Sequence, residues 1–199
     1  MTLSGSISSF IAGLVHGRDP ELGDHHDRTR KIIESFARLV HCSEEEVTLL
    51  GLGARIHDIG KLVINSNILL KPSRLTASEF DAIKAHSRLG AELLSPLVLD
   101  PRIGELVKHH HENYDGSGYP DQLAGDKIPK FAQIIRIVDC FDAITSDRPY
   151  HKGASVDDAL KVMRRDSRFF NPGYFETFFE MARGPHLRGL PIASSMSAV

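Results

Sequence analysis

The stretch that decides the fold is DHHDRTRKIIESFARLVH, residues 24–41. It carries five apolar residues at the spacing of one helical face: Ile32, Ile33, Phe36, Leu39 and Val40. Helical periodicity of this kind dominates the rest of the chain, and alternating, strand-like runs are scarce. The sequence therefore predicts an all-α protein built as a bundle of helices.

Two further helices are marked by the residues that start them. Ser43, followed by three glutamates, is a typical helix start, and we expect its helix to run into His57. Thr76 and Glu79 have the spacing of a capping box, in which each side chain bonds the backbone of the other residue. The helix that they start is expected to carry His86.

Loops and later helices follow from glycine, proline and apolar spacing. Residues 61–74 are expected to form a loop, and DGSGYP at 115–120 holds too much glycine and proline to continue a helix. A helix from about Pro129 is expected to carry Asp139. The phenylalanine-rich stretch 169–181 is predicted to be a closing amphipathic helix, with its aromatic side chains in the core.

Length and charge limit what the protein can be. With 199 residues and 41% hydrophobic residues, the chain fits one domain over 1–199, with a core at about 18–183 and a flexible tail at 184–199. The formal net charge is −2, and the charges are dispersed. We therefore expect no binding to a nucleic acid polymer and no binding to an anionic membrane.

Cysteine usage and hydropathy bear on the compartment. The two cysteines, Cys42 and Cys140, form no Cys-x-x-Cys pattern, which suits a reducing compartment. The N-terminal residues lack the basic start of a signal peptide, and no segment reaches the roughly 18 apolar residues of a membrane span. We expect a cytoplasmic protein.

The chemistry is indicated by the histidines, of which there are eleven. They recur beside aspartates on segments that are far apart in the chain: His25, His57-Asp58, His86, the run 109–111, and Asp139. Helical bundles build metal centres from side chains on separate helices in this way. Mixed nitrogen and oxygen donors suit iron, manganese or zinc.

The pair His57-Asp58 has the chemistry of a site for two metals. One residue offers an imidazole to one ion, and the other offers a carboxylate that bridges to a second. Two ions held about 3.5–4 Å apart generate a hydroxide nucleophile and stabilise charge at phosphorus. Glu21 lies four residues before His25, so it either recruits a third metal or complements the helix dipole, and the sequence leaves both readings open.

Four segments together resemble the HD-GYP family of HD phosphohydrolases. They are HDIGK at 57–61, ILLKPSRLTASEF at 68–80, HHENYDGSGYP at 110–120 and DCFDAITSDRPY at 139–150. The resemblance implies a helical bundle of the HD phosphohydrolase type. It also implies hydrolysis of the second messenger cyclic di-GMP, by metal-activated hydroxide, to pGpG and onward to GMP.

The resemblance also implies a site. The metal ligands carried over are Glu21, His25, His57, Asp58, His86, His110, His111 and Asp139, for two or three divalent ions, iron or manganese by preference. Asp58 and Lys61 are the residues expected to act in catalysis. Lys61, Tyr119 and Arg148 are expected to contact the dinucleotide: the two cations at its phosphates, and Tyr119 by stacking on a guanine or by anchoring the loop.

Two positions depart from the family pattern. His151, which is also expected to contact the substrate, stands where the family has a lysine that helps to hold it, and Asn65 stands where the family has a proline. Neither position is a ligand. These departures bear on the choice between cyclic di-GMP and a related cyclic dinucleotide rather than on metal binding.

Two other functions stay open at this point. One is a signalling module that binds a cyclic dinucleotide or a diguanylate cyclase domain and turns over little. The other is an HD-type nucleotidase that acts on mononucleotides. Of the remaining histidines, His16, His41 and His186 are expected at the surface, while His26 and His109 are expected to support neighbouring ligands at most.

Overall fold

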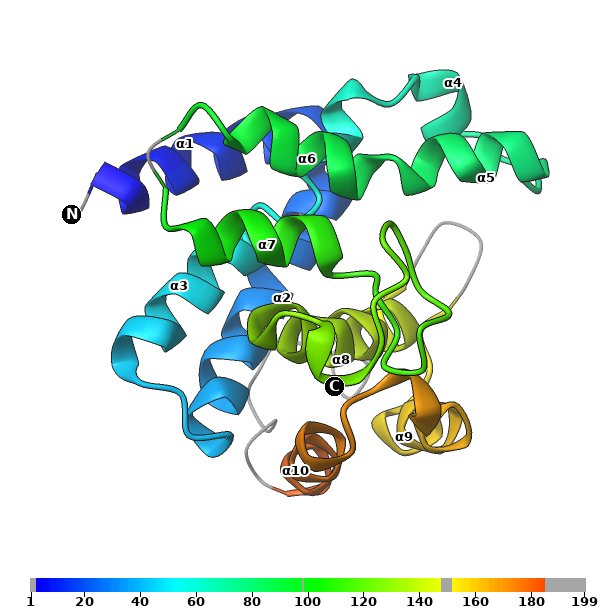
Figure 1. Ribbon diagram of the computed structural model, residues 1–199. Coiled ribbons are helices and arrows are strands. Elements are labelled where there is room, and N and C mark those ends of the chain that lie inside the picture. Colours follow the sequence, from blue (N-terminus) through cyan, green and yellow to red (C-terminus); the bar gives the residue numbers. More distant parts are fainter. Residues whose placement is uncertain (1–2, 98, 148–151, 185–199) are drawn as a thin grey trace, which may run out of the picture.

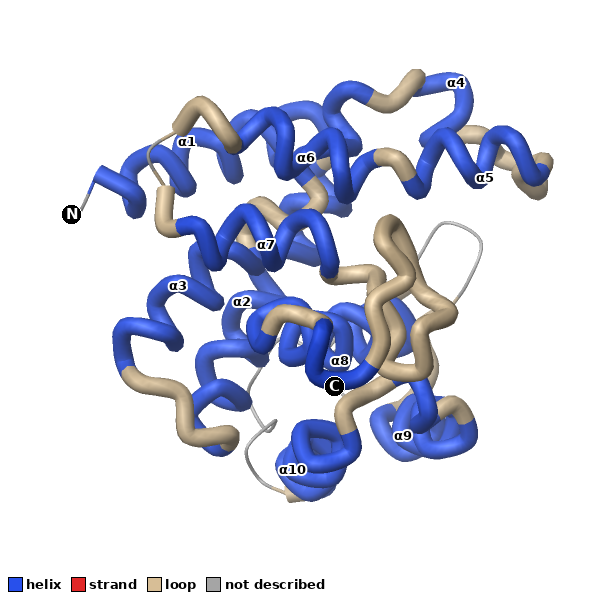
Figure 2. The backbone as a smooth tube through the Cα atoms, viewed as in Figure 1, coloured by secondary structure: helices blue, strands red, loops and turns tan. Residues whose placement is uncertain are grey.

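The structure, a computed structural model, describes residues 3–97, 99–147 and 152–184. These residues form helices and connecting loops, with no strand among them (Figures 1 and 2). The prediction of an all-α bundle is confirmed. Residues 185–199 of the predicted tail and the predicted substrate contacts Arg148 and His151 lie outside the described residues.

The helices follow one another in chain order with short connections. The α-helices are α1 (Leu3–Arg18), α2 (Pro20–Leu39), α3 (Glu44–Ala54), α4 (Ser66–Leu69), α5 (Ala77–Lys84), α6 (His86–Leu94), α7 (Pro101–His109), α8 (Lys130–Thr145), α9 (Val156–Arg165) and α10 (Pro172–Arg183). Short 3₁₀ helices are η1 (Ile59–Val63), η2 (Gly125–Lys127) and η3 (Ser167–Phe169).

Helices α2 and α8 run through the middle of the bundle (Figure 1). α2 packs against α1, α3 and α8, while α7 joins α3, α6 and α8. The predicted apolar stripe of α2 is buried for most of its length, and its Phe36 meets Phe178 of α10 edge to face, with ring centroids 5.2 Å apart. Phe141 of α8 meets the same ring. Phe175 and Phe178 of the last helix therefore belong to the core, as expected, and Phe179 packs against it.

Both predicted helix starts are present. The Ser43 hydroxyl accepts from the Glu46 amide while the Glu46 carboxylate accepts from the Ser43 amide, and Thr76 and Glu79 form the same reciprocal pair. Such caps satisfy amides that have no partner inside the helix. α2 begins earlier than its apolar stripe, because Asp19 caps it by accepting from the Leu22 amide.

Three expectations about helix limits are wrong in detail. The helix from Thr76 is divided at Ala85, so His86 is the first residue of a separate helix, α6. The expected loop at 61–74 contains the end of η1 and the short helix α4. Finally, α3 ends at Ala54, and His57 and Asp58 lie in the turn that follows.

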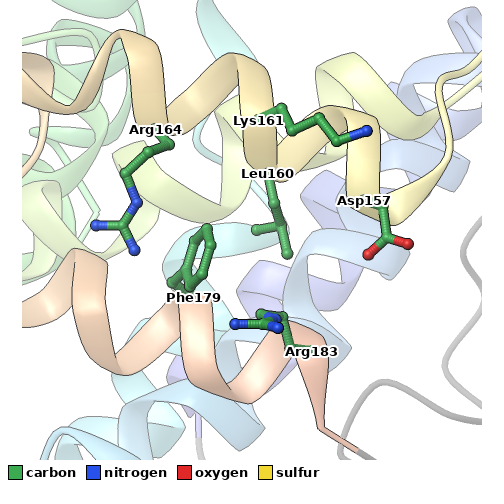
Figure 3. Close-up of a pocket in the computed structure, with 6 residues that line it drawn as sticks. All are labelled: Asp157, Leu160, Lys161, Arg164, Phe179 and Arg183. Carbon is green, nitrogen blue, oxygen red and sulfur yellow. The ribbon is translucent and has the colours of Figure 1, made fainter.

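Two further features are a surface cavity and the length and hydropathy of the helices. A cavity of about 410 Å³ opens between α9 and α10 (Figure 3), and it is lined by Asp157, Leu160, Lys161, Arg164, Phe179 and Arg183. None of these six is a predicted site residue. Among the described residues, no helix combines the length and the apolar character needed to cross a membrane.

Candidate metal centre

Imidazoles and carboxylates from five parts of the chain meet between α2, α6, α7 and α8. His25 comes from α2 and Asp139 from α8, while His57 and Asp58 come from the turn after α3. The others stand at helix ends: His86 begins α6, and His110 and His111 follow the last residue of α7. The seven residues, which the sequence predicted to come from segments far apart in the chain, are thus brought together.

One side of the cluster is formed by His25, His57 and Asp139 around one oxygen of Asp58. The His25 Nε2 atom is 3.2 Å from Asp139 Oδ1 and 3.4 Å from His57 Nε2. His57 Nε2 lies 3.5 Å from Asp58 Oδ2 and 3.8 Å from Asp139 Oδ1. These are the spacings of donor atoms that converge on a common point.

The other oxygen of Asp58 faces a second group of histidines. Asp58 Oδ1 lies 3.1 Å from His86 Nε2 and 3.7 Å from His110 Nε2, and these two nitrogens are 3.2 Å apart. The His111 ring packs on His110 with centroids 4.1 Å apart. Asp58 therefore offers one carboxylate oxygen to each group, as a bridging ligand does.

Hydrogen bonds on the far side of each ring fix which nitrogen faces the cluster. The Nδ1 atoms of His57, His86 and His110 lie 2.9, 2.7 and 2.8 Å from backbone carbonyl oxygens. A carbonyl only accepts, so each Nδ1 carries the proton and each Nε2 turns a lone pair inward. This is the arrangement by which proteins orient histidines that bind metals.

His25 is oriented by a carboxylate instead of a carbonyl. Its Nδ1 lies 2.6 Å from Asp142 Oδ2, and Asp142 is itself held by Arg28, whose Nε and Nη2 donate at 2.8 and 3.0 Å. Burial opposes charge on His25, but the hydrogen bonds with Asp139 and Asp142 raise its pKa to about 9. Asp142 and Arg28 were not predicted. Their signal in the sequence was the three-residue spacing of Asp139 from Asp142 and of His25 from Arg28.

The electrostatics keep the His57 imidazole unprotonated and the Asp58 carboxylate charged. Burial lowers the pKa of His57 to about 4. Burial disfavours a charge on Asp58, yet Lys61 and the neighbouring histidines hold the pKa of that carboxyl well below its usual range. Asp58 is thus a buried anion beside the neutral imidazole of His57, a pair of donors that suits a cation.

The residues present fit a pair of metal ions. Asp58 Oδ1 is buried without a hydrogen-bond partner among the described residues, which is costly unless a cation occupies the space beside it. Two sets of donors have all their ligand atoms within 4.8 Å of one another: His25, His26, His57 and Asp58, and Asp58, His86, His110 and His111. The sets share Asp58.

His26 is the unexpected member of the first set. Only 2% of it is exposed, and its ring stands 4.8 Å from the His57 ring. The sequence interpretation gave it a supporting role because it neighbours His25. Burial and the neighbouring histidines lower its pKa well below the usual range.

The predicted substrate residues that the structure describes lie beside the cluster. Lys61 Nζ donates to Asp58 Oδ2 at 2.6 Å. The Tyr119 ring packs on His111 with centroids 4.8 Å apart, and the Lys84 ammonium lies 5.9 Å from the Tyr119 centroid. Glu21 is exposed in the first turn of α2 and belongs to neither donor set.

The loop that carries Tyr119 is tied down by Glu112, a residue that was not singled out from the sequence. Glu112 is 1% exposed, and its two carboxylate oxygens accept from the amides of Asp121 and Leu123 at 2.7 and 3.1 Å. A Cβ at Gly118 would overlap the backbone of Asn113 and Glu112, so the loop can close on itself only with glycine there.

Comparison with known proteins identifies the family. The family model described as "HD domain" matches residues 10–172. The chain belongs to the HD domain family. The resemblance to the HD-GYP subset is confirmed by curated relatives of this HD domain. One is the cyclic di-GMP phosphodiesterase response regulator RpfG of Xanthomonas campestris, 39% identical over 82% of this chain and 44% of that protein.

Other relatives carry a different substrate in their names. The 3'3'-cGAMP-specific phosphodiesterase 2 of Vibrio cholerae is 35% identical over 85% of this chain and 33% of its own length. The HD domain thus spans less than half the length of these curated relatives.

Solved structures agree on the fold. The cyclic GMP-AMP phosphodiesterase V-cGAP3 of V. cholerae superposes with a TM-score of 0.69, at 22% identity, over 96% of this chain and 51% of that chain. The HD domain of the L. monocytogenes phosphodiesterase PgpH, solved with cyclic-di-AMP, gives a TM-score of 0.64 at 19% identity, over 86% of this chain and 92% of that one.

Proposed function

We propose that this HD domain is a metal-dependent phosphodiesterase that hydrolyses cyclic di-GMP to pGpG and, in a second step, to GMP. The observation that carries the proposal is the position of Asp58, with one carboxylate oxygen toward each of two groups of inward-facing histidine nitrogens. The names of the curated relatives support the same class of reaction.

Two divalent ions, iron or manganese, are the proposed cofactors. One would be held by His25, His57, Asp58 and Asp139, and the other by Asp58, His86, His110 and His111. Bound there, the ions would polarise the scissile phosphate and lower the pKa of a water molecule. The donors are nitrogen and oxygen atoms, which suit these metals. Glu21, one helical turn before His25, is proposed as a ligand of a third ion.

Protein groups beside the metals would hold the substrate. Lys61 stands at the edge of the cluster, where its ammonium can stabilise charge on the scissile phosphate or protonate the leaving oxygen. Tyr119 is proposed to stack on a guanine, since its ring already packs on His111. Arg148 and His151 are proposed as phosphate contacts by their motif positions.

Cyclic di-GMP is proposed ahead of the mixed GMP–AMP dinucleotide because RpfG and PA4108 show higher identity than the cGAMP-specific relatives. A diguanylate cyclase domain is proposed as a protein partner. A cytoplasmic location stays a prediction.

The test is a product assay on protein loaded with Mn²⁺, or with Fe²⁺ in the absence of oxygen. Cyclic di-GMP, 3'3'-cGAMP and cyclic di-AMP are supplied separately, and the products are separated by chromatography. We expect pGpG to appear first from cyclic di-GMP, and no product from the Asp58→Asn variant. Tight binding with no turnover by metal-loaded protein would contradict the proposal and favour a binding module.

A further inference from the structure

His26 is buried with nothing to bond to. Only 2% of the residue is exposed, and neither Nδ1 nor Nε2 has a hydrogen-bond partner in the described part of the chain. A buried polar group left without a partner destabilises the folded protein, and buried side-chain nitrogens are almost always paired. The protein atoms therefore leave both ring nitrogens of His26 without a bonding partner.

The ring faces the metal centre. His26 Nε2 lies 4.0 Å from Asp58 Oδ2, and the ring centroid is 4.8 Å from that of His57 and 5.6 Å from that of His25. One ligand atom from each of these four residues falls within 4.8 Å of all the others. His26 is thus as well placed for a shared cation as its neighbours are.

The surrounding groups are already occupied. The His57 Nδ1 atom bonds the Ala54 carbonyl at 2.9 Å, and His25 Nδ1 bonds Asp142 at 2.6 Å. Asp58 Oδ2 accepts from the Lys61 ammonium at 2.6 Å. None of these contacts leaves His26 a partner of its own.

His109 provides the contrast. It also sits beside a ligand, His110, and is 5% exposed, but its two ring nitrogens lie 3.1 Å from the Glu105 carbonyl oxygen and 3.0 Å from Asp121 Oδ2. His109 belongs to neither donor set. Of two histidines that the sequence interpretation treated alike, one is satisfied by protein atoms and the other is not.

We infer that His26 is an additional metal ligand, which adds a nitrogen donor to the ion held by His25, His57 and Asp58. The inference rests on the proposed function, because it takes the two-metal centre as given. An additional imidazole raises the share of nitrogen donors at this position, which favours ions that lie later than manganese in the order of affinity for nitrogen ligands. His26 would thus tune this position toward iron.

The experiment uses the whole chain labelled with ¹⁵N-histidine and reconstituted with ¹¹³Cd²⁺. Cadmium is diamagnetic, so a ring nitrogen that binds it shows a ¹¹³Cd–¹⁵N coupling. The His26 resonances are assigned by their loss in His26→Gln. We expect coupling at a His26 ring nitrogen as well as at His57 and His86, and none at His109.

Metal titration supplies the second measurement. His26→Gln is expected to weaken Co²⁺ binding at one of the two positions by more than about 100-fold, beyond the 10–100-fold loss typical when a residue only orients a ligand. Mn²⁺ binding should weaken less. The matched variant His109→Gln should change neither affinity by more than about twofold.

The outcomes distinguish a failure of the His26 inference from a failure of the proposed function. If His57 and His86 couple to cadmium and His26 does not, the inference is overturned while the metal centre stands. If no histidine couples, the metal centre fails, and the proposed function fails with it. Should His26→Gln not fold, through-bond correlation to the assigned backbone identifies the His26 ring in the wild-type protein, and the coupling decides.

Discussion

At the scale of single residues, the centre depends on which nitrogen of each histidine faces inward. Three rings are fixed by backbone carbonyls of the preceding turn, so their orientation comes from local geometry alone. His25 is the exception, because its Nδ1 donates a hydrogen bond to a side chain from α8, the Asp142 carboxylate. One carboxylate outside the donor sets therefore controls one ligand.

Asp142→Asn tests this control. The amide keeps the shape of the side chain but loses the charge that both His25 and Arg28 use, so we expect metal affinity to fall by about 10–100-fold. Isothermal titration with Mn²⁺ measures it. Asp157→Asn, an exposed change on α9, is the control, and equal affinities for the two variants would contradict the role of Asp142.

The sequence predicted single residues well where a motif names them. The sequence predicts that His57, Asp58, His86 and Asp139 lie together, because recurring imidazoles and carboxylates suggest metal ligation. The sequence did not predict the roles of Asp142 and His26, because these roles depend on what lies across the bundle. Sequence spacing on one helix cannot show that a neighbouring helix leaves a ring without a partner.

At the scale of elements, the close approach of η1 to α6 sets the position of His86. A Cβ at Gly60 would overlap the His86 carbonyl oxygen, and one at Gly90 would come 3.1 Å from the Gly60 amide nitrogen. The glycine of HDIGK thus lets the turn that holds His57 and Asp58 lie directly against the start of α6. The separation of α6 from α5, which periodicity did not predict, makes His86 a helix-end residue.

Gly60→Ala should therefore harm both stability and the site. We expect a loss of about 1–3 kcal/mol in the free energy of unfolding, as for other overpacked positions, together with weaker metal binding. Urea denaturation of the metal-free protein measures the stability. Gly104→Ala in α7, where an added Cβ meets open space, should instead be neutral or stabilising by about 0.5–1 kcal/mol. A Gly60 variant as stable as the Gly104 variant would contradict this account of the packing.

The loop around Tyr119 is the second element that positions the site. Glu112→Ala removes the acceptor for two amides and should loosen the loop without changing the helices. Hydrogen–deuterium exchange is expected to become faster at Asp121 and Leu123. Glu180→Ala, on the exposed face of α10, serves as control. Unchanged exchange at both amides would show that Glu112 does not hold the loop.

At the scale of the whole molecule, the donor sets join parts of the chain that are far apart in sequence. The two donor sets take residues from α2, the turn after α3, α6 and the end of α7, and Asp139 of α8 lies against the first set. The periodicity of residues 24–41 predicted the helical class, but the order in which helices pack was not visible in the sequence. It depends on long-range contacts such as those of α2 with α8.

Because ions bound at such a cluster stabilise the folded state alone, removing them should lower thermal stability. At metal concentrations 100 times the Kd, one site contributes about 2.7 kcal/mol. For a chain of this size that corresponds to about 5–10 °C in Tm. A calorimetric scan before and after chelation measures the shift, and Asp58→Asn should show none. A Tm that chelation leaves unchanged would contradict a structural contribution from the metals.

The central claim is that two ions lie on either side of Asp58. Diffraction from crystals of the manganese- or iron-loaded protein, recorded on both sides of the metal's absorption edge, tests it most directly. We predict two anomalous peaks, one among His25, His57 and Asp139 and one among His86, His110 and His111, with an Asp58 oxygen directed at each. Anomalous density missing from both positions, in crystals whose protein binds metal in solution, would contradict the claim.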